Sequence, residues 1–117
     1  MMFLLMGSGL TTQAATSPEK HTFAIEQGQF IYDGKPMPIY SGEMHYARVP
    51  VAYWRHRMRM MKAMGLNAVA TYVFWNYHEV SPGKWDWKTD EHNLRLYIQT
   101  AQEEGLKVIL RPGPYCC

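Results

Sequence analysis

Two glutamates and two histidines stand at the ends of short apolar stretches in this 117-residue sequence. Glu43 lies two residues before His45, and His78 directly precedes Glu79. Two carboxylates about 5 Å apart are the arrangement that retaining glycosidases use, one as acid/base and the other as nucleophile. The sequence leaves the separation of Glu43 and Glu79 open. Each carboxylate could instead fix a neighbouring histidine, arginine or backbone amide.

Other chemistries have less support in these residues. A metal site from His45, His78 and Cys117 is conceivable, but no two of these residues have the close spacing usual for zinc ligands. The pair His78-Glu79 also lacks the helical His-Glu-x-x-His pattern. A Gly-x-Ser-x-Gly nucleophile elbow and a phosphate-binding glycine loop after a strand do not occur in the sequence. We therefore predict no metal and no cofactor.

Strands must position these groups. Residues 70–74 are mostly β-branched and aromatic, which predicts a buried strand, and polar and aromatic residues follow where it ends. Parallel α/β proteins form ligand sites at the carboxyl ends of their strands. The residues that could line such a cleft, or support it from behind, are Glu43, His45, Trp75, Asn76, His78 and Glu79.

The remaining pattern predicts a β-hairpin and then alternating strands and helices. The hairpin spans residues 22–26 and 29–32, with a turn at Gln27-Gly28 and a second turn over residues 33–36. A strand at residues 37–40 and a helix at residues 51–64 are expected before the strand at residues 70–74. After a turn at residues 81–83, we expect a helix capped by Asp90 and a strand at residues 106–110 that Arg111 ends. Gly65 and Gly105 each stop a helix before a strand.

The order strand, helix, strand, helix, strand predicts a parallel sheet with right-handed crossovers. Three strands and two helices leave sheet edges bare, and a (β/α)₈ barrel needs about 250 residues. We therefore expect an α/β fold that is a partial TIM barrel. It would comprise about the first three strands and two helices, preceded by the hairpin.

Composition limits the partners. The net charge of +2 is too small to argue for nucleic acid or an anionic membrane. Aromatic residues make up 14% of the chain, a share found both in sugar-binding clefts and in buried aromatic cores. The oligomeric state is left open.

The N-terminus predicts export. Residues 2–10 are mostly apolar, too short a run to span a bilayer, and a small-x-small cleavage motif follows at residues 12–14. We expect a signal peptide at residues 1–15, a linker at 16–22 and a catalytic-domain segment at 23–117. A frayed terminus or a misplaced start codon is the alternative, and a periplasmic or extracellular location depends on the signal peptide.

Six motifs stand in order along the chain, and one of them is Thr71-Tyr72-Val73-Phe74-Trp75-Asn76-Tyr77-His78-Glu79. The others are residues 32–36, 41–50, 53–55, 65–67 and 111–115. Together they resemble the start of glycoside hydrolase family 35, the β-galactosidase family of that number. The resemblance covers the sequence from about Phe23 onward.

The resemblance implies a (β/α)₈ barrel and retaining hydrolysis of terminal β-galactosyl groups. It places Tyr72 and Cys117 in the pocket that holds galactose. It also implies that the two catalytic glutamates follow the fourth and seventh strands, outside this chain, so Glu43 and Glu79 receive neither role. We expect a β-galactoside substrate and no turnover by these residues alone. A non-catalytic carbohydrate-binding module or an inactive barrel fragment is the alternative.

Overall fold

The computed structural model describes residues 20–113, which divide between two units at Pro36 and Met37. The first unit is an antiparallel sheet of β1 (Phe23–Glu26), β2 (Gln29–Tyr32) and β3 (Lys35–Pro36). The predicted hairpin is confirmed. The second turn does not end it, because Asp33 and Gly34 adopt positive φ angles of 48° and 74° and fold the chain back onto β2 as a short third strand.

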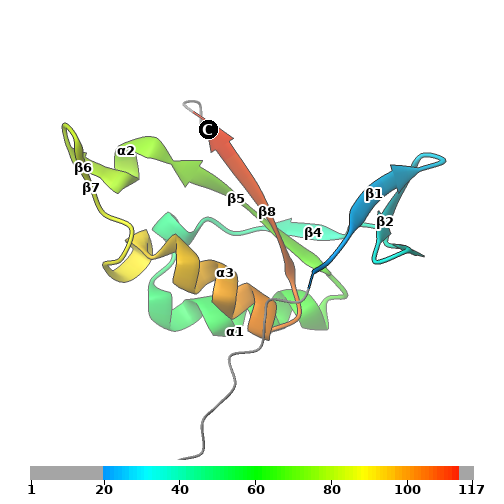
Figure 1. Ribbon diagram of the computed structural model, residues 1–117. Coiled ribbons are helices and arrows are strands. Elements are labelled where there is room, and N and C mark those ends of the chain that lie inside the picture. Colours follow the sequence, from blue (N-terminus) through cyan, green and yellow to red (C-terminus); the bar gives the residue numbers. More distant parts are fainter. Residues whose placement is uncertain (1–19, 114–117) are drawn as a thin grey trace, which may run out of the picture. The chain divides into compact units, whose positions relative to one another are not determined.

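The second unit contains a three-stranded parallel sheet in the order β4-β5-β8 (Figure 1). Its strands are β4 (Ser41–Glu43), β5 (Ala68–Phe74) and β8 (Lys107–Gly113), and the helices α1 (Val51–Ala63) and α3 (Leu94–Glu103) connect them. The predicted alternation and the parallel pairing are both confirmed. Parallel pairing brings the carboxyl ends of all three strands to the same end of the sheet.

The first and last strands of this sheet were predicted with wrong bounds, and β5 begins at Ala68 rather than at residue 70. Residues 37–40 are not a strand, because the Asn67 side chain takes the place of a strand partner. Its Nδ2 donates to Pro38 O at 2.6 Å, and its Oδ1 accepts from Tyr40 N at 2.8 Å. The last strand does not end at Arg111, since residues 111–113 continue the ladder opposite residues 72–74 of β5. The sheet therefore reaches further toward the candidate site than predicted.

A short helix and a hairpin follow β5. They are α2 (Trp75–His78) and the antiparallel pair β6 (Glu79–Ser81) and β7 (Lys84–Trp85), which the predicted turn joins. Asp90 does not cap α3, which is a correction: it begins a separate 3₁₀ turn, Asp90–His92. Asn93 is the cap, and its side chain accepts a hydrogen bond from Leu96 N at 2.9 Å.

Both helices end in the same way, as the repeated glycine pattern predicted. Gly65 and Gly105 have φ angles of 87° and 74°. Leu66 N donates to Met61 O, and Leu106 N donates to Ala101 O, which completes a Schellman motif at each end. Each motif turns the chain directly into the next strand.

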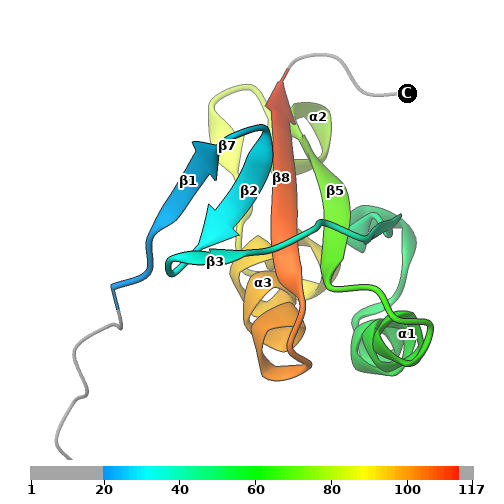
Figure 2. The ribbon, with the colours of Figure 1, turned by 90° about the vertical axis from the view of Figure 1, so that its right-hand side faces the viewer.

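The core lies between the sheet and its helices. Trp54 and Met58 of α1, Tyr97 and Ala101 of α3, and Val69 of β5 are all buried. Both helices lie on the same side of the strands (Figure 2). Leu110 of β8, by contrast, is 41% exposed. Within residues 20–113, no helix has the length and apolar character needed to cross a bilayer.

Candidate functional site

Four side chains gather at the carboxyl end of the sheet. They come from the end of β4, the segment just after it, β5 and β8, and we call them the strand-end cluster: Glu43, His45, Tyr72 and Arg111. The register explains their meeting. Tyr72 stands opposite Arg111 in the ladder, and Glu43 stands opposite Ala70.

Arg111 links the cluster across three strands. Its Nη1 donates to Glu43 Oε1 and its Nη2 donates to Tyr72 Oη, each at 2.5 Å. The guanidinium carbon also lies 3.9 Å from the centre of the Tyr72 ring. The side chains of Glu43 and Arg111 are 47% and 43% exposed, so the cluster faces open space.

His45 packs at the edge of β5 and is held in a neutral form. Its ring stacks on Tyr72 with centroids 5.3 Å apart, and Tyr72 N donates to its Nδ1 at 3.3 Å. The ring proton therefore belongs on Nε2, which lies 3.6 Å from Glu43 Oε1. Burial lowers the pKa of His45, and the charges of Arg48 and Arg111 act in the same direction while Glu43 opposes them.

Beneath the cluster, Tyr97 fixes the end of β4. Its buried hydroxyl donates to Met44 O at 2.7 Å, and Met44 N donates to Ala70 O at 3.0 Å. Burial raises the pKa of Tyr97, so it stays a neutral donor. The backbone next to Glu43 is thus held from both sides.

His78 lies in a separate, buried group. The side chain is 0% exposed, and Tyr46 Oη lies 2.8 Å from its Nε2 while Asp86 O lies 2.7 Å from its Nδ1. A carbonyl only accepts, so Nδ1 carries the proton and the Tyr46 hydroxyl donates to Nε2. The same hydroxyl accepts from Phe74 N at 3.2 Å. His78 therefore holds α2, the segment that follows β5, in place through its contacts with Tyr46 and the Asp86 carbonyl.

Glu79 and Trp75 fasten the β6–β7 hairpin. Glu79 accepts from Trp75 Nε1 at 2.5 Å and from Gly83 N at 2.8 Å. The hydrogen bond from Gly83, followed by that from Trp75, lowers the pKa of the Glu79 carboxyl. Glu43 contacts Arg111 and His45 instead, so the two glutamates have different partners. Asn76 is exposed on α2.

Three tryptophans line an apolar pocket of about 360 Å³ beside the strand ends. Its walls are Val73, Trp75, Trp85, Trp87, Pro112 and Gly113. Val73 and Tyr72 are successive residues of β5, so their side chains point to opposite faces of the sheet. The tryptophan pocket and Tyr72 therefore lie on opposite faces.

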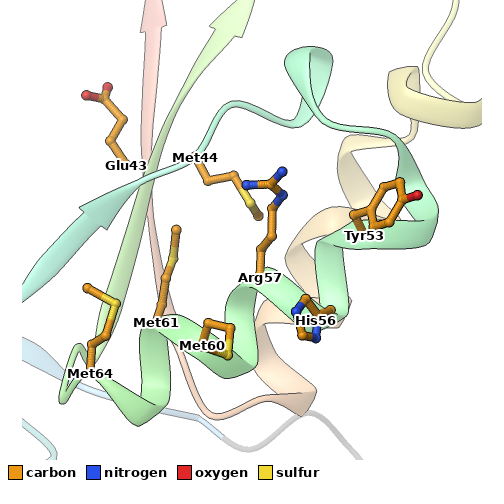
Figure 3. A pocket seen from close by; sticks show the side chains of 8 residues that line it. All are labelled: Glu43, Met44, Tyr53, His56, Arg57, Met60, Met61 and Met64. Atoms are coloured by element: carbon orange, nitrogen blue, oxygen red, sulfur yellow. The ribbon is translucent and has the colours of Figure 1, made fainter.

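A second hollow of about 420 Å³ runs between α1 and β4 (Figure 3). We call it the methionine groove, and it is lined by Glu43, Met44, Tyr53, His56, Arg57, Met60, Met61 and Met64. Figure 3 shows Arg57 reaching from α1 toward Met44 and the Glu43 side chain pointing away from α1.

The structure thus brings together three of the predicted site residues, Glu43, His45 and Tyr72. It places Trp75, His78 and Glu79 in other groups, and Cys117 lies outside the described residues. Sequence reasoning gave Arg111 no place in the site, because it treated this residue as a strand stop and as part of a motif. The signal was its position at the same end of the sheet as Tyr72. Within residues 20–113, no three metal-binding side chains converge, and His45 and His78 belong to different groups.

The sequence is similar to a hydrolase family over most of its length. The model of the family described as Glycosyl hydrolases family 35 matches residues 29–117. A β-galactosidase of Bos taurus is 47% identical over 116 residues, covering 97% of this chain and 17% of the relative. Those of Xanthomonas manihotis and Homo sapiens are 41% and 42% identical, covering 99% and 100% of this chain and 19% and 17% of their own lengths. The chain therefore spans less than a fifth of these curated relatives.

A solved structure is also similar. It is the crystal structure of a β-galactosidase from the psychrophilic Marinomonas ef1, with a TM-score of 0.52 and 22% identity. The match covers 62% of this chain and 11% of that chain. At this identity the likeness concerns the fold alone.

Proposed function

The chain belongs to glycoside hydrolase family 35, and from this premise we propose that it is the N-terminal part of a retaining β-galactosidase. The observation that carries the proposal is its identity of 41% to 48% to β-galactosidases over most of its length. The substrate would be a glycan or oligosaccharide with a terminal β-galactosyl group.

In this proposal, β4, β5 and β8 are the first three strands of a closed (β/α)₈ barrel. Their parallel order and the two helices on one face support it. The substrate would then lie at the carboxyl end of the strands, where Tyr72 and Arg111 meet. Tyr72 would hold the galactose together with Cys117.

The proposed reaction needs two glutamates outside this chain. One protonates the glycosidic oxygen while the other attacks the anomeric carbon, and the aglycone leaves a covalent galactosyl-enzyme. Water then attacks that carbon and gives its proton to the first glutamate, which releases galactose with retained configuration. The contacts of Glu43 with Arg111 and of Glu79 with Trp75 and Gly83 support structural roles for both carboxylates.

A chimera tests the proposal. This chain would replace the matching N-terminal segment of the Xanthomonas manihotis β-galactosidase, which aligns with 99% of it. We expect the chimera to hydrolyse an aryl β-galactoside and the 117-residue chain alone to show no turnover. A folded but inactive chimera would contradict the proposal. Binding of galactose by the isolated chain, together with that inactivity, would favour the non-catalytic alternative.

We further propose that residues 1–15 direct export and are then removed. The apolar run at residues 2–10 and the small residues after it support this. Fusion of residues 1–22 to a reporter, with N-terminal sequencing of the exported product, tests it. A reporter retained inside the cell would contradict export.

A further inference from the structure

We propose that Arg111 is a positioning residue, whose guanidinium, anchored by Glu43, fixes the place and the hydrogen-bond direction of the Tyr72 hydroxyl. The inference rests on the proposed function, because it takes Tyr72 as a contact to the galactosyl group. It gives a role in the site to Arg111, which stands in one of the six motifs but received no site role from the sequence.

The geometry restrains Tyr72 in two ways. A hydrogen bond of 2.5 Å from Nη2 holds the oxygen, and the guanidinium carbon 3.9 Å from the ring centre limits rotation of the ring. The stacked ring of His45 adds a further contact at 5.3 Å. Tyr72 is therefore held by the residues around it before any ligand binds.

The direction of the hydroxyl follows from the chemistry of arginine. A guanidinium has five N–H donors and no acceptor, so the Tyr72 oxygen must accept from it. The phenolic hydrogen is thus directed away from Arg111. We infer that Tyr72 acts as a donor toward an oxygen of the sugar.

Glu43 gives Arg111 its orientation. Its carboxylate accepts a hydrogen bond from Nη1, while Nη2 donates to Tyr72 Oη. The planar guanidinium of Arg111 on β8 therefore connects β4 with β5. Lysine has a single ammonium group without this fixed fork, and it cannot reproduce both contacts in the same geometry. The role of Arg111 is therefore specific to arginine.

The active chimera described above provides the test. We expect Arg111→Lys and Arg111→Met to raise KM about tenfold with little change in kcat, because the Tyr72 contact is made in ground and transition states alike. The matched control is Arg59→Met, which removes another arginine that is paired with a carboxylate: Arg59 lies on α1 and its partner Glu104 directly follows α3. A KM for Arg111→Met equal to that of Arg59→Met would overturn the inference, while an inactive parent chimera would instead count against the proposed function.

A double-mutant cycle separates positioning from general damage. If Arg111 acts through the Tyr72 hydroxyl, Arg111→Met should change KM less than about twofold in a Tyr72→Phe background. Additive effects of the two substitutions would overturn the inference.

The 117-residue chain provides a second measurement that does not depend on the chimera. In NMR spectra, we expect the guanidinium of Arg111 to give separate, slowly exchanging N–H signals, and Tyr72→Phe to shift them. Averaged signals like those of free arginine, or signals that Tyr72→Phe leaves unchanged, would contradict the inference.

Discussion

At the scale of single residues, buried polar groups decide how the segments after β4 and β5 lie. The Tyr46 hydroxyl joins them, because it accepts from Phe74 N and donates to His78. We predict that Tyr46→Phe destabilises the chain by about 1–3 kcal/mol, since it leaves a buried amide and a buried imidazole nitrogen without their partner. Urea unfolding followed by tryptophan fluorescence measures the loss. Tyr53→Phe, at an exposed position of α1, is the control, and an equal effect of both would contradict the prediction.

The lowered pKa values of His45 and His78 make the stability of the chain depend on pH. Burial is the main cause that lowers the pKa of both His45 and His78. Below about pH 6.5, the unfolded chain therefore binds protons that the folded chain does not, and stability falls as the pH decreases from there toward the folded-state values. We expect a lower urea midpoint at pH 5.5 than at pH 7.5.

The His78→Gln variant tests whether His78 contributes to this pH dependence of stability. It should show a smaller drop in midpoint between the two pH values, although its stability at pH 7.5 is also reduced. His56→Gln, at an exposed site on α1, is the control. Equal drops in the two variants would exclude His78 as a source of the pH dependence.

The sequence could predict which residues follow strands, but not which of them share a surface. His45 and His78 occupy similar places in the pattern, each within two residues of a glutamate after an apolar stretch. The first stacks on Tyr72 at the cluster, whereas the second is buried against Tyr46 and Trp87. That difference depends on the register and on the short helix α2, which the local sequence pattern does not encode.

At the scale of elements, the helix stops were the most predictable feature. A glycine directly before an apolar strand marks a left-handed residue, because few other residues adopt a positive φ without strain. We predict that Gly65→Ala and Gly105→Ala each destabilise the chain by about 1 kcal/mol. Thermal unfolding monitored by circular dichroism measures this.

Gly113→Ala is the matched control for these variants. Gly113 lies in β8, has no positive φ and leaves open space where a Cβ would stand. It should therefore change stability little. If Gly113→Ala proved as destabilising as Gly65→Ala, the left-handed conformation would not be the cause.

Strand ends were less predictable than helix ends because distant side chains decide them. Asn67 replaces a strand partner for residues 38 and 40, and pairing with β5 extends β8 past Pro112. Proline suggested a stop there, yet Pro112 lies at an edge of this sheet, where its missing N–H costs no ladder bond. Such effects appear only once the strands are aligned.

At the scale of the molecule, the family and the similar solved structure indicate a TIM-barrel-type domain. Within the described residues, β4 and β8 each pair with β5 alone, so each has one edge open. The methionine groove lies between α1 and β4 (Figure 3), and its Met60 and Met64 are 52% and 73% exposed. Open strand edges beside exposed apolar side chains favour association between chains.

We therefore predict that the isolated chain self-associates through the methionine groove. The double variant Met60→Glu, Met64→Glu should weaken this, because two like charges would repel across the contact and remain hydrated when the chain is monomeric. Sedimentation velocity over a range of concentrations measures the change. Gln99→Glu adds a charge at an exposed position of α3 that does not line the groove, and it serves as the control. If the double variant sedimented like Gln99→Glu, association would have to involve the open edge of β8 instead.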